Sequence, residues 1–331
     1  MAYTTIDDPS AYFKIQTYAG TGSSNAQTFA DTDTDMQPDM VWIKERDDTN
    51  DHNLFDAVRG AGELIRPNRT NAQNSTTEGV KSFDSDGFTL GTNSSLNGGS
   101  STYVAWCWKE SATAGFDIIA FTGNATARTI SHSLSAVPHW MITKNTVDGE
   151  QWRCYHRGFA TDPETDYMDF NLNETLNDNA DIWNDTAPTS SVFSVGTDSG
   201  VNGNTDAMIA YLWTSIQGFS KFGSYRGNDG NDGAFVYTGF KPAYVMTKKY
   251  SATGASWQIC DNKRPGFNVI NDSLSVDSTA VEQTHVAMDF CANGFKCRNS
   301  NRDSNHNALY AFMAFAEQPF VNSEGVPNNA E

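Results

Sequence analysis

Three stretches of this 331-residue sequence share one pattern: "PDMVWIK" at residues 38–44, "PHWMITK" at 138–144 and "PAYVMTK" at 242–248. Each begins with proline, continues through a short apolar run and ends at a lysine. A short run of β-branched and aromatic residues predicts a buried strand. Recurrence of the pattern about every hundred residues predicts an internal repeat.

Other features recur in the same order around each of these stretches. An aromatic-x-Gly step precedes each one, and a strand that closes on arginine follows it. Each copy then has a short strand around a phenylalanine and ends in an apolar strand aligned on an alanine. The recurring residues are Gly20, Gly123 and Gly227; Arg59, Arg157 and Arg264; Phe88, Phe193 and Phe295; Ala105, Ala210 and Ala311.

The length and composition of each copy indicate its fold. About a hundred residues with roughly seven short strands suit one β-sandwich and exceed a propeller blade or a solenoid repeat. The sequence is rich in Asn, Ser, Thr, Gly and Asp and has no segment with helical periodicity. We therefore expect an all-β protein with under ~10% helix. Its three tandem jelly-roll or lectin-like sandwiches, each with a separate core, would span residues 1–110, 111–216 and 217–331, the last with a C-terminal tail.

Two hairpins support this interpretation. Asp86-Gly87 and Asn293-Gly294 favour two-residue type I′ turns. The resulting registers place apolar residues on one face and polar residues on the other, with Cys291 and Cys297 on opposite faces. The second copy, "TSSVFSV", lacks the turn pair. The apolar faces contain Phe83, Phe88 and Leu90 in one hairpin, and Phe290, Phe295 and Cys297 in the other.

The closing strands have apolar residues on both faces, which predicts central positions in a sheet. In "YVAWCWK", Tyr103, Ala105 and Cys107 point one way and the intervening residues point the other way. Four tryptophans of such central strands are expected in the core, whereas Trp183, in the loop "NADIWNDTAP", is expected to be more exposed. The four are Trp42, Trp106, Trp140 and Trp213.

The net charge and the cysteine pattern argue against some classes of protein. A net charge of −18 argues against a phosphate-binding or nucleic-acid-binding surface. Five scattered cysteines without a CxxC predict free, mostly buried thiols rather than a disulfide framework. The sequence contains no apolar stretch of membrane-spanning length, and "MAYTTIDDPSAYF" does not read as a Sec signal peptide. The five cysteines are Cys107, Cys154, Cys260, Cys291 and Cys297.

No motif predicts a metal or cofactor site. The stretches "DTDTD" (31–35) and "GNDGNDG" (227–233) do not have the EF-hand combination of a glycine at loop position six and a distal glutamate. Solvated turns are the favoured interpretation, and weak calcium binding stays open. The six histidines do not recur at one place in all three copies, so a zinc or haem site is not expected.

No catalytic constellation is expected either. There is no GxSxG, and Cys154 with His156 lacks a third orienting group. Glycoside hydrolysis needs two nearby carboxylates, for which only a composite site between copies stays open. Asp56 with Arg59 and Asp261 with Arg264 recur at one spacing, and a strand-end ion pair is favoured over a binding cleft. No catalytic, cofactor-binding or metal-binding residue is assigned, and the binding residues are unknown.

Several stretches resemble domains of marine and cyanobacterial tailed-phage virion proteins. These are "PDMVWIKERD", "FDAVRGAGE", "SFDSDGFTLGTN", "TYVAWCWKE", "GFKPAYVMTKK" and "YAFMAFAEQPFVNSEGVPNNAE". The resemblance covers almost the whole chain and implies a lectin-like, tail-fibre-like structural module with no agreed catalytic residues. Unlike larger members, this chain has almost nothing before its first copy, so attachment would use residues 1–12, a module face or the C-terminal tail.

The resemblance and the missing catalytic motifs together give the functional expectation. The chain would be a non-enzymatic virion protein of the tail, recognising a host surface and its polysaccharide. A capsid decoration or head-fibre protein is the alternative, and a polysaccharide-degrading enzyme a distant one. Expected partners are other virion proteins and further copies of the chain, with a homotrimer favoured. Nucleic acid and membrane insertion are not expected.

Overall fold

The computed structural model describes residues 3–30 and 34–328 and is all-β, with 42% strand and 5% helix, as expected from the sequence. The few helical turns lie in loops. They are η1 (Pro9–Ala11), α1 (Ser94–Asn97), α2 (Ala180–Trp183) and α3 (Ser199–Asn202).

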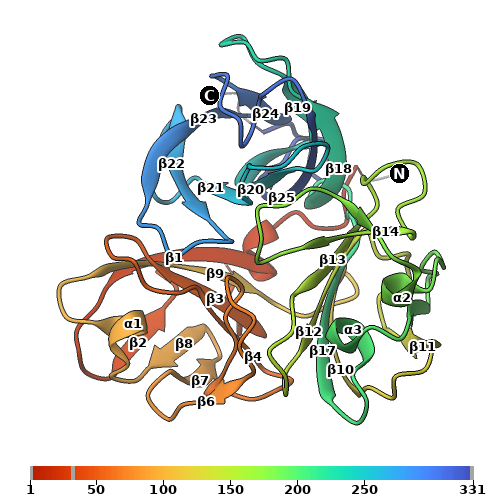
Figure 1. Cartoon of the computed structure of the whole chain (residues 1–331). Coiled ribbons are helices and arrows are strands. Elements are labelled where there is room, and N and C mark those ends of the chain that lie inside the picture. The colour runs from red at the N-terminus through yellow and green to blue at the C-terminus, as the bar shows by residue number, and fades with distance from the viewer. Residues whose placement is uncertain (1–2, 31–33, 329–331) are drawn as a thin grey trace.

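Three large antiparallel sheets follow one another along the chain and form three lobes around a common centre (Figure 1). The first has the order β1-β9-β3-β4, the second β10-β17-β12-β13-β14-β15, and the third β18-β25-β20-β21-β22-β23-β24-β19. We call the segments that hold them the first, second and third lobe. The strands of the first sheet are β1 (Phe13–Ala19), β9 (Thr102–Trp108), β3 (Met40–Glu45) and β4 (Asn53–Asp56).

The strands of the second sheet are β10 (Phe116–Thr122), β17 (Ala207–Trp213), β12 (Trp140–Asn145), β13 (Arg153–His156), β14 (Asp166–Asp169) and β15 (Asn177–Asp178). Those of the third are β18 (Ser220–Arg226), β25 (Leu309–Pro319), β20 (Phe240–Lys249), β21 (Gln258–Asp261), β22 (Ile270–Ser275), β23 (Gln283–Cys291), β24 (Gly294–Cys297) and β19 (Phe235–Tyr237). In each sheet the opening strand pairs with the closing strand, which pairs with the Pro-led strand. The closing strands are therefore central, as their two apolar faces predicted.

A smaller outer layer accompanies each large sheet. It is β2-β8-β7 in the first lobe and β11-β16 in the second. In the third lobe the corresponding order β19-β24-β23 continues the large sheet instead of forming a separate one. The remaining strands are β2 (Asn25–Thr28), β8 (Gly87–Leu90), β7 (Val80–Asp84), β11 (Arg128–Ser131), β16 (Val192–Val195), β5 (Glu63–Leu64) and β6 (Asn74–Ser75).

The core differs from the expectation of three separate cores. Each lobe has its own apolar cluster beneath its outer layer, but a fourth cluster contains residues of all three lobes. Strand β9 shows why: Tyr103, Ala105 and Cys107 pack in the cluster of the first lobe, whereas Val104, Trp106 and Trp108 point into the shared centre. There Trp108 lies 6.5 Å from Trp213 and 5.7 Å from Phe315, measured between ring centroids. A sheet that is apolar on both faces must be covered twice, and the other lobes supply the second cover.

The tryptophans were predicted correctly in four cases and wrongly in one. Trp42, Trp106, Trp140 and Trp213 are buried, as expected. Trp183 is also buried, contrary to the expectation. It ends α2 and packs against Tyr155, at 6.2 Å between rings, within the apolar cluster of the second lobe.

The recurring aromatic-x-Gly step reflects a close approach of two backbones. A Cβ atom at Gly20 would lie 2.0 Å from the carbonyl oxygen of Gly98, and one at Gly123 would lie 2.0 Å from that of Gly203. At Gly227 the oxygen of His306 would be 2.2 Å away. Only glycine, which has no Cβ, permits this approach at the end of each opening strand.

The two turns lie one residue earlier than expected, which shifts the pairing of each hairpin by two residues. Asp84 pairs with Gly87 and Cys291 with Gly294, so the turns are Ser85-Asp86 and Ala292-Asn293. Neither Ser85 nor Asp86 has a positive φ, so the first turn is not type I′. The glycines instead serve the neighbouring strands: a Cβ at Gly87 would lie 1.9 Å from the oxygen of Gln27, and φ at Gly87 is +125°. The predicted face division is correct, because Phe83 pairs with Phe88, Phe290 pairs with Phe295, and Cys291 and Cys297 lie on opposite faces.

A Gly87→Val substitution is expected to lower the free energy of unfolding by more than ~1 kcal/mol. It would place a β-branched residue at positive φ and drive its side chain into β2. Gly254→Val is the matched control, because φ is +80° there but no atom lies within 4 Å of the added Cβ. Urea denaturation of both variants measures the difference. Equal losses would show that backbone strain alone, and not the contact with β2, governs this turn.

Candidate functional site

The lysines that end the three Pro-led stretches are fully buried. Lys44, Lys144 and Lys248 each donate to main-chain carbonyl oxygens, and the last two reach the lobe that precedes their own. The Nζ atom of Lys144 lies 3.0 Å from the oxygen of Thr70, and that of Lys248 lies 3.4 Å from the oxygen of Leu172. Burial lowers the pKa of each of the three to about 8. These lysines therefore tie loops together and do not contact solvent.

The ends of β4, β13 and β21 carry Asp56, His156 and Asp261, which bind neighbouring lobes. Asp56 Oδ2 accepts a hydrogen bond from the Tyr211 hydroxyl at 2.6 Å, and Asp261 Oδ2 accepts one from Trp106 Nε1 at 3.0 Å. His156 Nε2 lies 3.2 Å from the carbonyl oxygen of Phe312. The first lobe is thus joined to the second through Asp56, the second to the third through His156, and the third to the first through Asp261. The contacts form a closed ring.

The two aspartates of this set also hold the arginine three positions later. Arg59 Nε is 2.6 Å from Asp56, and Arg264 Nε is 2.7 Å from Asp261. Arg264 also donates to the carbonyl oxygen of Ile259 at 2.9 Å. The expected strand-end ion pair is confirmed, and its additional role between lobes was not predicted.

The expected equivalence of Arg157 with these arginines is wrong. Trp140 pairs with His156 where Met40 pairs with Asp56 and Tyr244 with Asp261. His156 therefore occupies the place of the aspartates, and Arg157 comes one residue after it. The sequence pattern matched Arg157 by residue type, whereas strand pairing defines the true correspondence.

A second set of contacts lies just before the same strands. His52 Nε2 lies 3.0 Å from the oxygen of Ser275, and Trp152 Nε1 donates to the oxygen of Arg66 at 3.0 Å. Trp257 Nε1 lies 3.4 Å from the oxygen of Asp169. These bonds join the same three pairs of lobes, so the junctions are hydrogen-bonded as well as apolar.

Three buried asparagines were missed by the sequence analysis. Asn97, Asn202 and Asn305 are fully buried and each bridges the loop after the opening strand to the segment before the closing strand. The recurring "LNG" and "VNG" before two of the closing strands could have revealed them. Each satisfies several main-chain groups, so we interpret them as structural.

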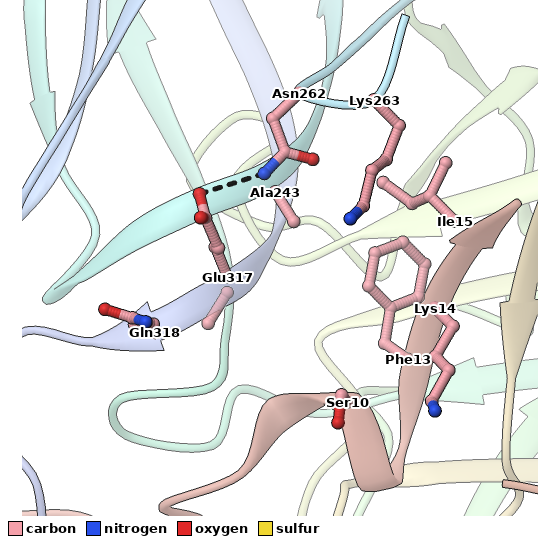
Figure 2. Close-up of a pocket in the computed structure, with 10 residues that line it drawn as sticks. Ser10, Phe13, Lys14, Ile15, Ala243, Asn262, Lys263, Glu317 and Gln318 are labelled. Carbon is pink, nitrogen blue, oxygen red and sulfur yellow. Dashed lines mark hydrogen bonds between the residues drawn. The ribbon is translucent and has the colours of Figure 1, made fainter. Parts of the chain in front are cut away.

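Two clefts open where lobes meet. The first, of about 210 Å³, lies between β1 and the turn after β21 (Figure 2). Figure 2 shows Lys263 directed toward Ile15 and Phe13, and Asn262 hydrogen-bonded to Glu317 at 2.9 Å.

The second cleft, of about 640 Å³, lies between β18 and the turn after β13. Its size falls within the range of ligand-binding pockets. Tyr237, Arg157 and Lys221 line it, as does Tyr3, whose hydroxyl lies 3.1 Å from that of Tyr237. Tyr237 is 48% exposed, so part of its ring is available to a ligand. We call this the Tyr237 cleft.

The residues weighed for metal binding do not come together. Within residues 3–30 and 34–328, no group of three or more His, Cys, Asp or Glu side chains is placed to hold a metal ion. Of the two Asp-rich stretches, residues 31–33 lie outside the described residues. In the other, Asp232 forms an ion pair with Lys296 at 2.5 Å.

The cysteines are as predicted. All five are free, four are buried, and Cys291 is partly buried. Burial raises the pKa of the Cys154 thiol, and its neighbour His156 is engaged between lobes. This pair is therefore not poised as a nucleophile and base.

One serine–histidine–aspartate arrangement was not found from the sequence. His285 Nδ1 lies 3.4 Å from Ser273 Oγ, and its Nε2 lies 3.3 Å from Asp303. The Ser273 side chain is fully buried, its hydroxyl donates to the oxygen of Gln283, and it lines neither of the two clefts. We interpret the arrangement as structural, because no substrate could reach the hydroxyl.

The comparison with protein families gives one result. The chain belongs to the family described as "Domain of unknown function (DUF7483)", whose model matches residues 8–319. No curated protein matches the chain. Within the described segments, no helix has the length and apolar character needed to span a membrane.

Proposed function

We propose that this chain is a non-enzymatic virion protein of a tailed phage, built from three tandem copies of one β-sandwich unit. Residues 1–110, 111–216 and 217–331 are the three copies. The shared strand order of the three sheets and the ring of equivalent contacts support this division. The assignment to a virion rests on the sequence resemblance.

The specific task that we propose is recognition of polysaccharide on the host surface by a tail fibre or tail tip. The observation that carries this proposal is the Tyr237 cleft, in which a half-exposed aromatic ring lies beside two cations and several hydroxyl and main-chain groups. Sugar rings stack their C–H faces on aromatic rings, and their hydroxyls need nearby polar partners. Binding without turnover is the corresponding activity.

Adsorption of the purified protein to host cells tests this proposal. The fluorescently labelled protein is expected to bind intact cells, and prior removal of surface polysaccharide should abolish binding. Tyr237→Ala should weaken binding, whereas Phe267→Ala, at an 82% exposed ring outside the cleft, should not. Release of sugar from the polysaccharide would contradict the non-enzymatic assignment, and undiminished binding by Tyr237→Ala would remove the cleft from the recognition surface.

We also propose that the chain assembles with itself, with a homotrimer favoured, and with other virion proteins. Phage appendages of this kind act through symmetric repetition of one interface. Light scattering of the purified protein should give a mass above that of the monomer, and antibody labelling of particles should fall on the tail. Labelling of the capsid surface would replace the tail with a capsid decoration or head fibre, and a strict monomer would contradict self-assembly.

A further inference from the structure

The Tyr237 cleft has a charge opposite to that of the molecule. The chain carries a net charge of −18, yet none of the described residues that line this cleft is acidic. Arg157 comes from the second lobe and Lys221 from the third, so the two cations of the cleft belong to different lobes. A cleft lined by charges of one sign concentrates ligands of the opposite sign, so this cleft can attract anions although the protein as a whole is negative.

Arg157 is held by a neutral group. Its Nη1 donates to His139 Nε2 at 2.6 Å, and His139 Nδ1 lies 2.9 Å from the hydroxyl of Ser215. A guanidinium can only donate, so His139 Nε2 is the acceptor of this bond, and His139 Nδ1 faces the main-chain N–H of Ser215 at 3.0 Å. Burial lowers the pKa of His139 to about 4, so the imidazole stays neutral at ordinary pH. Arg157 is therefore oriented without losing its charge to a carboxylate.

Lys221 is held in the same way. Its Nζ donates to the main-chain oxygen of Tyr237 at 3.1 Å and lies 5.1 Å from the centroid of the Tyr237 ring. A carbonyl dipole and an aromatic face position an ammonium group but leave its charge uncompensated. The same tyrosine thus supplies an exposed ring and fixes the neighbouring cation.

Other arginines at lobe junctions have carboxylate partners. Arg59 pairs with Asp56, Arg264 pairs with Asp261 and Glu282, and Arg46 pairs with Glu282. In each of these pairs a carboxylate compensates the charge of the arginine. The neutral partners of Arg157 and Lys221 therefore distinguish the Tyr237 cleft from structural ion pairs.

We infer that the Tyr237 cleft binds anionic saccharides, with the carboxylate or sulfate of the sugar between Arg157 and Lys221 and a sugar ring on Tyr237. This inference rests on the proposed recognition of polysaccharide and names its chemical class. The planar guanidinium matches the two oxygens of a carboxylate or the oxygens of a sulfate, and the ammonium adds a second charge.

Titration calorimetry with three probes tests the inference. Alginate hexasaccharide supplies carboxylates, ι-carrageenan oligosaccharide supplies sulfates, and maltohexaose is neutral. We expect one or both anionic probes to bind and maltohexaose not to bind. Binding should weaken as salt is raised from 0.05 to 0.5 M, because the Debye length then shortens from about 14 Å to about 4 Å. Arg157→Gln and Lys221→Gln should each raise Kd by about tenfold or more.

Lys263→Gln is the matched control, because it removes one exposed cation from the smaller cleft shown in Figure 2. Thermal unfolding of every variant verifies that folding is intact. A loss of anionic binding in Lys263→Gln, with none in Arg157→Gln, would overturn the assignment to the Tyr237 cleft.

Two further outcomes separate the inference from the proposed function. If maltohexaose binds as tightly as the anionic probes and the Arg157 and Lys221 variants bind normally, the anionic class is wrong but polysaccharide recognition stands. If no probe binds and intact host cells do not retain the protein, both are wrong. Whether alginate or carrageenan binds identifies the anion as carboxylate or sulfate.

Discussion

Asp261→Ala is expected to lower the free energy of unfolding by about 3–5 kcal/mol, which is the usual loss when one partner of a buried ion pair is removed. Asp261 and Arg264 are both fully buried at the junction of the first and third lobes. Removing the carboxylate deprives the guanidinium of its nearest partner and leaves Trp106 Nε1 without an acceptor. Chemical denaturation monitored by tryptophan fluorescence measures the change.

Two further variants sharpen this experiment. Asp289→Ala removes a carboxylate from a more exposed pair with Arg298 and should cost about 1 kcal/mol or less. Trp106→Phe, combined with Asp261→Ala in a double-mutant cycle, isolates the bond between the lobes, for which we expect a coupling of about 1.5–3 kcal/mol. A coupling near zero would mean that the apolar centre alone joins the lobes.

Acid is expected to weaken the junctions through His52 and His156. In both rings Nδ1 accepts a main-chain or indole N–H, from Trp42 in one case and Gly158 in the other, and Nε2 faces a carbonyl oxygen of another lobe. A second proton on Nδ1 would set donor against donor. Burial accordingly lowers the pKa of each histidine to about 3.

The direction of the pH dependence follows from these pKa values. Between the unfolded pKa of about 6.5 and the folded pKa, the unfolded chain binds more protons, so stability is present above pH 6.5 and is lost as the pH falls. At pH 4.5 each histidine should have cost about 2–3 kcal/mol relative to pH 7. Urea denaturation at a series of pH values measures the slope.

Variants of the histidines identify the source of the slope. His156→Gln keeps a donor for the oxygen of Phe312 but cannot titrate, so its stability should fall less steeply between pH 6.5 and 4.5. His306→Gln, at an exposed histidine, should keep the slope of the unchanged protein. Identical slopes for all three proteins would show that carboxylates, and not the junction histidines, govern acid unfolding.

Short-range features of the fold could be predicted because they depend on neighbouring residues. The alternation in "YVAWCWK" located a central strand, and the face division of both hairpins was correct. The turn positions were one residue away, because Gly87 and Gly294 are required by close approach to β2 and β19 rather than by type I′ turns. An aspartate–glycine pair looks the same in either case.

The candidate site depended on contacts that the sequence does not display. The sequence pattern predicts a strand-end role for Arg157. The strand pairing gives that position to His156, and Arg157 instead lines a cleft. Tyr3, Lys221 and Tyr237 carry no motif. Their meeting depends on how the N-terminal segment and the second and third lobes pack.

Composition and apolar alternation, which depend on neighbouring residues, were enough to predict the all-β class, the central closing strands, the free thiols and most of the buried aromatic residues. The shared centre and the closed ring of lobes could not be predicted in this way, because they depend on contacts between distant segments. The bonds that close the ring join residues 155 or 156 positions apart, as Asp56 to Tyr211, Trp106 to Asp261, and His156 to Phe312. A strand that is apolar on both faces requires a second cover but does not specify which segment provides it. That choice is made by shape and hydrogen bonding when the three sheets meet.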